Sequence, residues 1–110
     1  MHEFSLAEAL CGTVEKWRAE HGGKIESVTV EIGRLGGVDP EALKYAFGLL
    51  TSWPLKTVLL PLRFRCGKCG GEMETDRFPD TCPACGTDAA DLRRLNGREL
   101  SIREIEVSDV

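Results

Sequence analysis

The sequence has no long apolar run, few aromatic side chains and no excess of basic residues. No segment approaches the roughly 18 apolar residues that a membrane-spanning helix requires. Aromatic residues make up 6% of the 110 residues, and 18 acidic residues outnumber 14 basic ones, for a net charge of −4. A protein that binds the phosphate backbone of nucleic acids needs a basic surface. We therefore expect neither a membrane protein nor a general nucleic-acid binder.

The residue patterns of common enzymes are also missing. The sequence contains no Ser/His/Asp or Cys/His nucleophile set, no phosphate-binding loop and no carboxylate pair with an evident acid–base role. The first ten residues lack the basic start of a secretory signal and place Glu3 and Glu8 where such a signal is apolar. We expect a non-enzyme of the cytoplasm, where cysteines stay reduced and their spacing indicates metal chemistry.

Four of the five cysteines form two CxxC pairs. Cys66 and Cys69 make the first pair, Cys82 and Cys85 the second, and each pair is followed by glycine. Two such turns complete a tetrahedral shell of four thiolates, which is typical of zinc. An iron site and a redox dithiol are the alternatives for the same residues. Because four protein ligands leave no open position, we expect the metal to be structural.

Apolar periodicity on both sides of the cysteines predicts two helices and three strands. The first expected helix is opened by a capping box at Ser5–Glu8, and the second is capped by Asp39 and buries Leu43, Ala46, Phe47 and Leu50. The first expected strand, over 28–32, has one solvated face. The second strand, over 58–64, is interrupted at Pro61, and the third, over 99–107, has a bulge near Arg103 and Glu104.

The order of these elements predicts the fold. The last strand has no core of its own, so it should return to the first sheet, and the cysteine segment then becomes an insertion. We expect an α+β fold with a small mixed sheet of about three strands, two helices and an inserted zinc-ribbon module. The predicted domains are residues 1–64 with 97–110 and residues 65–96.

A second candidate metal site lies at Met1-His2-Glu3. The Met1 amine, the His2 amide nitrogen and a His2 imidazole nitrogen can close adjacent chelate rings on one ion, and Glu3 can add a fourth donor. Nitrogen-rich, near-planar donors suit Ni(II) or Cu(II) more than Zn²⁺. Only four residues precede the expected start of the helix at Ser5, which would hold the donors near a rigid element. The alternative is a disordered start with a solvated histidine.

Taken together, these residues resemble the HypA/HybF family, the nickel-insertion accessory proteins of [NiFe]-hydrogenase maturation. The resemblance extends over MHEFSLAEAL, VTVEIGRLGGVDPEALKYAF, CGKCG, CPACG and GRELSIREIEV, nearly the whole chain. It implies a nickel chaperone with a zinc ribbon, working with a partner GTPase to deliver Ni(II) to the hydrogenase large subunit. Some relatives also serve urease.

The resemblance also implies which residues bind each metal. The Met1 amine, His2 and Glu3 would hold nickel transiently, and the four cysteines of the CxxC pairs would hold zinc. Asp39 stands where some relatives have an acidic residue near nickel, although its role as a helix cap explains it fully. The segment 51–65 is shorter and more basic-apolar than is usual in the family, which leaves the orientation of the zinc module open.

The alternative function is a zinc-ribbon adaptor that binds nucleic acid or protein. Arg63, Arg65 and Lys68 lie next to the first cysteine pair and could contact a nucleic acid locally. A second basic cluster, Arg93-Arg94 with Arg98, is either a solvated face or a docking patch. The acidic net charge and the scarcity of aromatic residues beside the cysteines argue against nucleic acid.

Overall fold

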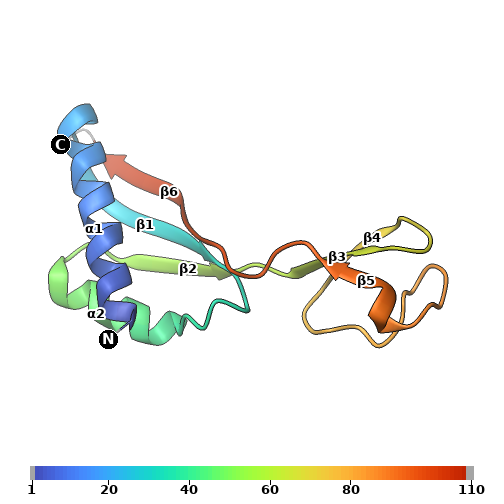
Figure 1. The fold of residues 1–110 in the computed structure, drawn as a ribbon. Helices are drawn as coiled ribbons and strands as arrows, with labels where there is room; N and C mark the ends of the chain where they lie inside the picture. Colours follow the sequence, from blue (N-terminus) through green and yellow to red (C-terminus); the bar gives the residue numbers. More distant parts are fainter. Residues whose placement is uncertain (1, 109–110) are drawn as a thin grey trace.

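The computed structural model describes residues 2–108, with side chains from Glu3 onward. In chain order the elements are α1 (His2–His21), β1 (Lys24–Ile32), α2 (Pro40–Leu50), β2 (Leu55–Leu59), β3 (Leu62–Cys66), β4 (Glu72–Thr75), the short 3₁₀ helix η1 (Ala89–Asp91), β5 (Leu92–Arg94) and β6 (Leu100–Ser108). They form two lobes joined by a narrow waist, in a molecule of 55 × 30 × 16 Å (Figure 1). Within the described range, no helix combines the length and apolarity that a membrane span needs.

The first lobe is built on a mixed sheet with the strand order β2-β1-β6. β1 pairs in parallel with β2 and antiparallel with β6. Parallel neighbours need a crossover connection, and α2 supplies it between β1 and β2. β6 returns to this sheet after the second sheet, β4-β3-β5, has been completed. The predicted α+β fold, a three-stranded mixed sheet with two helices and an inserted module, is confirmed.

The core of the first lobe lies between β1 and the two helices. Val28, Val30 and Ile32 of β1 are buried in one cluster with Val14 of α1 and Phe47 of α2. These alternate β1 residues point to one face of the sheet, so both helices cover that face. Their burial is the main stabilising term of the lobe.

Two details of residue burial in the first lobe differ from the sequence-based expectation. The opposite face of β1 is not solvated throughout, because Ser27 and Thr29 are only 5% and 9% exposed. The Ser27 hydroxyl donates to Glu106 Oε1 of β6 at 2.5 Å, and that carboxylate also binds Lys56 of β2. Leu50, expected to be buried, is 36% exposed because α2 ends there.

The start of α1 was also predicted wrongly. The helix begins at His2, three residues before Ser5, so Ser5 lies inside the first turn and is no N-cap. Nothing in the first four residues opposes helix formation, since proline and glycine are absent and Glu3 favours the positive end of the helix dipole. The cap predicted for α2 is confirmed: Asp39 accepts hydrogen bonds from the N–H groups of Glu41 and Ala42.

The strand expected over 58–64 is in fact two strands in two sheets. β2 ends at Leu59, and β3 starts at Leu62 and pairs with β4 and β5. Pro61 has no N–H to give to a ladder, so the chain leaves the first sheet there. The bulge in β6 is confirmed, because Glu104 faces Thr29 and Ile102 faces Val30, which leaves Arg103 unpaired. The second sheet thus begins at Leu62, while the division into domains stays a prediction.

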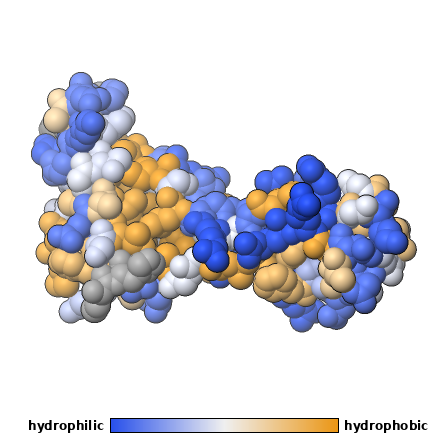
Figure 2. Space-filling model, in the orientation of Figure 1, coloured by the Kyte–Doolittle hydropathy of each residue, from blue (hydrophilic) through white to orange (hydrophobic). Residues whose placement is uncertain are grey.

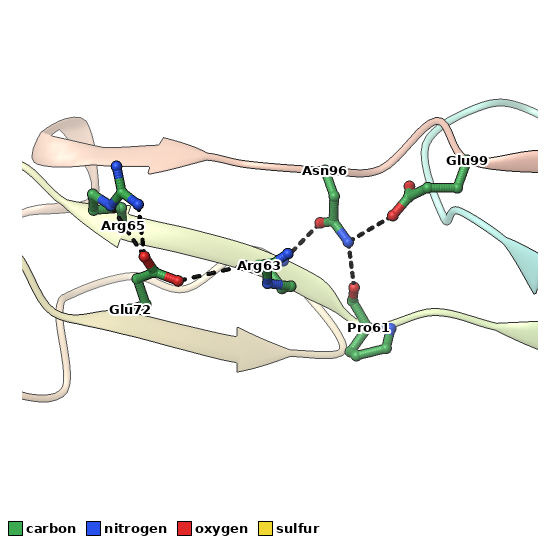
Figure 3. A network of polar contacts seen from close by, with 6 residues as sticks. All are labelled: Pro61, Arg63, Arg65, Glu72, Asn96 and Glu99. Atoms are coloured by element: carbon green, nitrogen blue, oxygen red, sulfur yellow. Dashed lines mark hydrogen bonds and ion pairs between the residues drawn. The ribbon is translucent and has the colours of Figure 1, made fainter.

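The waist is held by Asn96, whose side chain extends the ladder of the second sheet (Figure 3). Its Oδ1 accepts from the Arg63 N–H at 2.8 Å, and its Nδ2 donates to the Pro61 carbonyl at 3.0 Å. The same Nδ2 donates to Glu99 Oε2 at 2.8 Å, and Glu99 Oε1 accepts from the Gly97 N–H at 2.7 Å. The Asn96 amide therefore takes the place of a peptide group where the regular pairing of β3 and β5 ends.

A loop of the first lobe completes the waist. The Leu35 N–H donates to the Gly97 carbonyl at 2.6 Å, and Arg34 Nε donates to the Leu60 carbonyl at 3.0 Å. Gly97 is buried with φ of 140°, and a Cβ there would lie 2.8 Å from Leu35 Cδ1, so this crossing requires glycine. Arg34 also reaches Asp76 of the second lobe at 3.4 Å. Both chain segments of the waist are thus fixed by hydrogen bonds.

Candidate metal sites

The second lobe brings the four cysteines of the CxxC pairs to one point. Their four Sγ atoms all lie within 4.8 Å of one another. The Cys66 and Cys85 sulfurs are 3.7 Å apart, and the Cys69 and Cys82 sulfurs are 3.8 Å apart. A tetrahedral zinc ion with Zn–S bonds of about 2.3 Å requires S–S edges of about 3.8 Å. The spacing fits zinc and is far too long for a disulfide, whose S–S bond is about 2.05 Å.

Each CxxC turn is closed in the same way by the glycine that follows it. The Gly70 N–H donates to the Cys66 carbonyl at 2.9 Å, and the Gly86 N–H donates to the Cys82 carbonyl at 2.7 Å. Both glycines have positive φ angles, 74° and 76°, which other residues adopt only with strain. The turn leaves the Lys68 and Cys69 N–H groups pointing at Cys66 Sγ, at 3.3 and 3.4 Å. Backbone dipoles thus stabilise negative charge on the sulfur that a metal would bind.

The thiols differ in how easily they lose a proton. The Cys85 N–H, as a hydrogen-bond donor, lowers the pKa of Cys82 to about 7, and the Cys69 N–H likewise lowers the pKa of Cys66. The Thr87 N–H works to lower the pKa of Cys85, but desolvation and the neighbouring sulfurs outweigh it and raise that pKa to about 11. Four thiolates at this spacing repel one another without a cation, and a divalent metal would remove that cost.

The cysteine cluster also supplies much of the interior of the second lobe. Cys66 and Cys82 are 1% exposed, whereas Cys69 and Cys85 lie at the surface. The Phe64 ring packs edge-on against Phe78 at 5.7 Å, and Phe78 itself is 58% exposed. Among side chains 3–108, these cysteines form the one group of three or more metal-ligating residues. A module with so small an apolar interior is of the kind that a metal stabilises.

The second candidate site lies partly outside the described residues. Met1 and the side chain of His2 are not described, so the nickel ligands predicted there stay a prediction. The Glu3 carboxylate accepts from the Asp39 N–H at 3.4 Å, which brings the first turn of α1 against the start of α2. Asp39 Oδ1 in turn accepts from the Glu41 N–H at 3.0 Å. Glu3 and Asp39, both singled out in the sequence, are therefore neighbours. Figure 1 shows the N-terminal end of α1 beside α2 at this end of the first lobe.

Comparison with known proteins assigns the family. The family description "Hydrogenase/urease nickel incorporation, metallochaperone, hypA" matches residues 1–107. The chain belongs to the HypA family. The resemblance noted in the sequence is thereby confirmed, and so is a function within nickel incorporation for hydrogenase maturation.

Curated HypA proteins align with almost the whole chain. The hydrogenase maturation factor HypA of Geobacter metallireducens is 36% identical over 113 residues, covering 97% of this chain and 99% of the relative. The HypA protein of Chlorobaculum tepidum is 36% identical over 114 residues, with the same coverage. Two solved HypA structures share the fold. The solution structure of the Ni metallochaperone HypA from Helicobacter pylori has a TM-score of 0.64 and 20% identity over 98% of both chains. A second HypA solution structure has a TM-score of 0.71 and 21% identity.

Proposed function

We propose that this chain carries Ni(II) at its amino terminus and helps to insert it into [NiFe]-hydrogenase during maturation. The ligands would be the Met1 amine, His2 and Glu3. Membership in the HypA family supports the metal, and the start of α1 at His2 supports the site. The first four N–H groups of an α-helix have no partner within the helix. A nickel ion that replaces the His2 amide proton therefore breaks no hydrogen bond of the helix.

The surroundings of this site favour a metal that can leave again. The contact between Glu3 and the Asp39 N–H brings two helix N-termini together, and each concentrates partial positive charge that opposes a cation. The Glu3 and Asp39 carboxylates offset part of that charge. A site at the end of a helix can be approached by acceptor thiolates without unfolding the lobe. These properties suit a carrier that holds nickel and then surrenders it.

The four clustered cysteines would hold a structural Zn²⁺ ion. When bound, the ion would serve to cross-link the two CxxC turns. Because four protein ligands complete a tetrahedral shell, that ion lacks the open position that catalytic zinc needs. We assign no catalytic activity to the chain and place it in the cytoplasm. Its partners would be a maturation GTPase and the hydrogenase large subunit, and urease is a further recipient named by the family description.

The test is a calorimetric Ni(II) titration of the zinc-loaded, untagged chain against the His2→Ala variant. We expect the variant to lose stoichiometric nickel binding and to keep its fold and its zinc. The matched control is His21→Ala, because His21 lies at the other end of α1, stacked on Trp17 at 4.4 Å. One extra residue before Met1 should weaken binding as much as His2→Ala, since an amide replaces the amine. Equal nickel uptake by wild type and His2→Ala would contradict the proposal.

The adaptor alternative is less well supported. Of the three cations near the first cysteine pair, Arg65 and Arg63 both bind Glu72, at 2.7 and 3.4 Å (Figure 3). Among the described residues, Lys68 alone of the three has no ion-pair partner. Binding of DNA or RNA that weakens steeply with salt would favour the adaptor.

A further inference from the structure

The segment from Leu92 to Ile102 forms a continuous free edge across both lobes. β5 is an edge strand of the second sheet, and β6 is an edge strand of the first. Residues 95–99 join the two strands in an extended course through the waist (Figure 1). An edge strand presents backbone donors and acceptors that no neighbouring strand uses, which makes it a template for a further strand.

The hydrogen bonds of this segment define which residues face outward. The Leu95 N–H donates to the Arg63 carbonyl, and the Leu35 N–H donates to the Gly97 carbonyl, so the odd-numbered residues face the protein. In an extended chain the backbone groups alternate. The backbone N–H and C=O groups of Arg94, Asn96 and Arg98 therefore point away from the neighbouring strands. Within residues 2–108, these groups have no backbone partner on the outward side.

The same segment carries basic charge that the rest of the described chain does not neutralise. Arg93, Arg94 and Arg98 form no ion pair there, although the chain as a whole has a net charge of −4. The Glu99 carboxylate, next to Arg98 in the chain, is occupied by hydrogen bonds from Asn96 and Gly97. The Asp91 carboxylate, near Arg93, accepts a hydrogen bond from the Thr87 hydroxyl. On the face seen in Figure 2, most of the waist is strongly hydrophilic, next to the more apolar first lobe.

A shallow, open hollow lies along this edge. Residues 94–99 line a volume of about 400 Å³, with Arg94 and Arg98 among them. Guanidinium groups bind carboxylates with two parallel hydrogen bonds, which gives geometric specificity as well as energy. An extended segment with acidic side chains would satisfy the outward backbone groups and the arginines together.

We propose that residues 92–98 are a docking edge for an extended acidic segment of a partner protein, which adds to β5 as a further strand. Backbone hydrogen bonds would fix the register, and carboxylates on alternate residues would pair with Arg94 and Arg98. The inference is independent of the nickel ligands, because the edge lies at the waist and on the second lobe.

The probe is a labelled eight-residue peptide of alternating glutamate and valine, titrated into the zinc-loaded full chain at low salt. Three comparison ligands are a glutamine–valine peptide, the glutamate peptide with alternate backbone N-methyl groups, and a single-stranded oligonucleotide. The variant is Arg94→Glu/Arg98→Glu. Its matched control is Lys16→Glu/Lys24→Glu, which changes the net charge equally at two exposed lysines of the first lobe. Amide spectra verify that each variant is folded.

We expect the glutamate peptide to bind with amide shifts confined to residues 92–98 and their β3 partners. The arginine variant should bind about tenfold more weakly, while the lysine variant keeps at least half the affinity. The glutamine and N-methylated peptides should bind far less. Absence of binding, equal binding by the arginine variant, or equal binding of either altered peptide would overturn the proposal. So would preference of this edge for the oligonucleotide, or a dimer of the chain formed through it.

Discussion

The two lobes are stabilised in different ways. Ten buried apolar side chains, from α1, α2 and β1, form one cluster in the first lobe. In the described part of the second lobe, the buried apolar residues are Leu62 and Phe64, together with the cysteines Cys66 and Cys82. Burial at roughly 25 cal/mol per Å² can hold the first lobe, whereas the second has too little apolar area and would depend on metal–sulfur bonds at the four clustered cysteines. A chain of this size can thus keep one lobe folded by packing and the other by metal.

Loss of a zinc ligand gives the largest effect and tests this difference directly. Cys82→Ser should release zinc and unfold the second lobe, because structural zinc contributes about 10–16 kcal/mol in small zinc-dependent modules. The first lobe should keep its helices. Zinc analysis measures the loss of the metal, and amide spectra show which lobe remains folded. Cys11→Ser is the matched control, since Cys11 packs against the first-lobe core outside the cluster. If both lobes melt together after Cys82→Ser, the predicted domain division is wrong.

A core truncation should give the opposite pattern. Phe47 is fully buried in the first lobe. Phe47→Ala should lower the free energy of unfolding of that lobe by about 3–5 kcal/mol, through lost burial and the cavity left behind. Urea denaturation followed by tryptophan fluorescence measures this, since Trp17 and Trp53 both pack on the same core.

Two further results complete this test. Tyr45→Ala, at a position 70% exposed on the same helix, should change the stability by less than about 0.5 kcal/mol. Zinc content should stay unchanged in both variants. Release of zinc from Phe47→Ala would show that the two lobes are stabilised as one unit.

The parts of the structure that local patterns determine were predictable. Three predictions depend on only a few neighbouring residues each, and the structure confirms the local feature in each case. They are the meeting of the four CxxC cysteines, the Asp39 cap of α2 and the bulge in β6 near Arg103. Pro61 predicts an interruption of the strand, but only pairing with distant strands shows that β2 and β3 belong to different sheets.

The waist could not be predicted in the same way. Asn96 forms hydrogen bonds with Arg63 and Pro61, which lie 33 and 35 positions earlier in the chain, as well as with the nearby Glu99. Nothing in the local sequence marks Asn96 as a substitute for a peptide group. The fixed crossing of the two lobes is therefore a property of tertiary contacts, and it can be tested as such.

Removal of the Asn96 amide should loosen the junction and leave both lobes folded. Asn96→Ala leaves the Arg63 N–H and the Pro61 carbonyl without their protein partner, at a cost of about 0.5–1.5 kcal/mol for each hydrogen bond. Residual dipolar couplings should then require two independent alignment tensors, whereas one tensor should fit the wild type. Asn96→Gln is the control that keeps the amide but displaces it. A single tensor for the alanine variant would mean that the Arg34 and Gly97 contacts suffice.

Acidification should weaken the same junction with a smaller effect. Desolvation works to raise the pKa of Glu99, but hydrogen bonds from its own backbone, Gly97 and Asn96 outweigh it and lower that pKa below its ordinary value of about 4.5. A carboxylate whose pKa is lowered by folding contributes stability above its unfolded pKa, and this is lost as the pH falls through the folded value. The alignment of the two lobes should hold at neutral pH and change only below about pH 4.5, in step with protonation of Glu99.

Glu99→Gln, which cannot ionise, should abolish that pH dependence, whereas Glu72→Gln should retain it, because Glu72 binds arginines within the second lobe. A junction that loosens at the same pH in Glu99→Gln would assign the titration to another carboxylate, and Asp76, which pairs with Arg34 across the lobes, would be the next to replace.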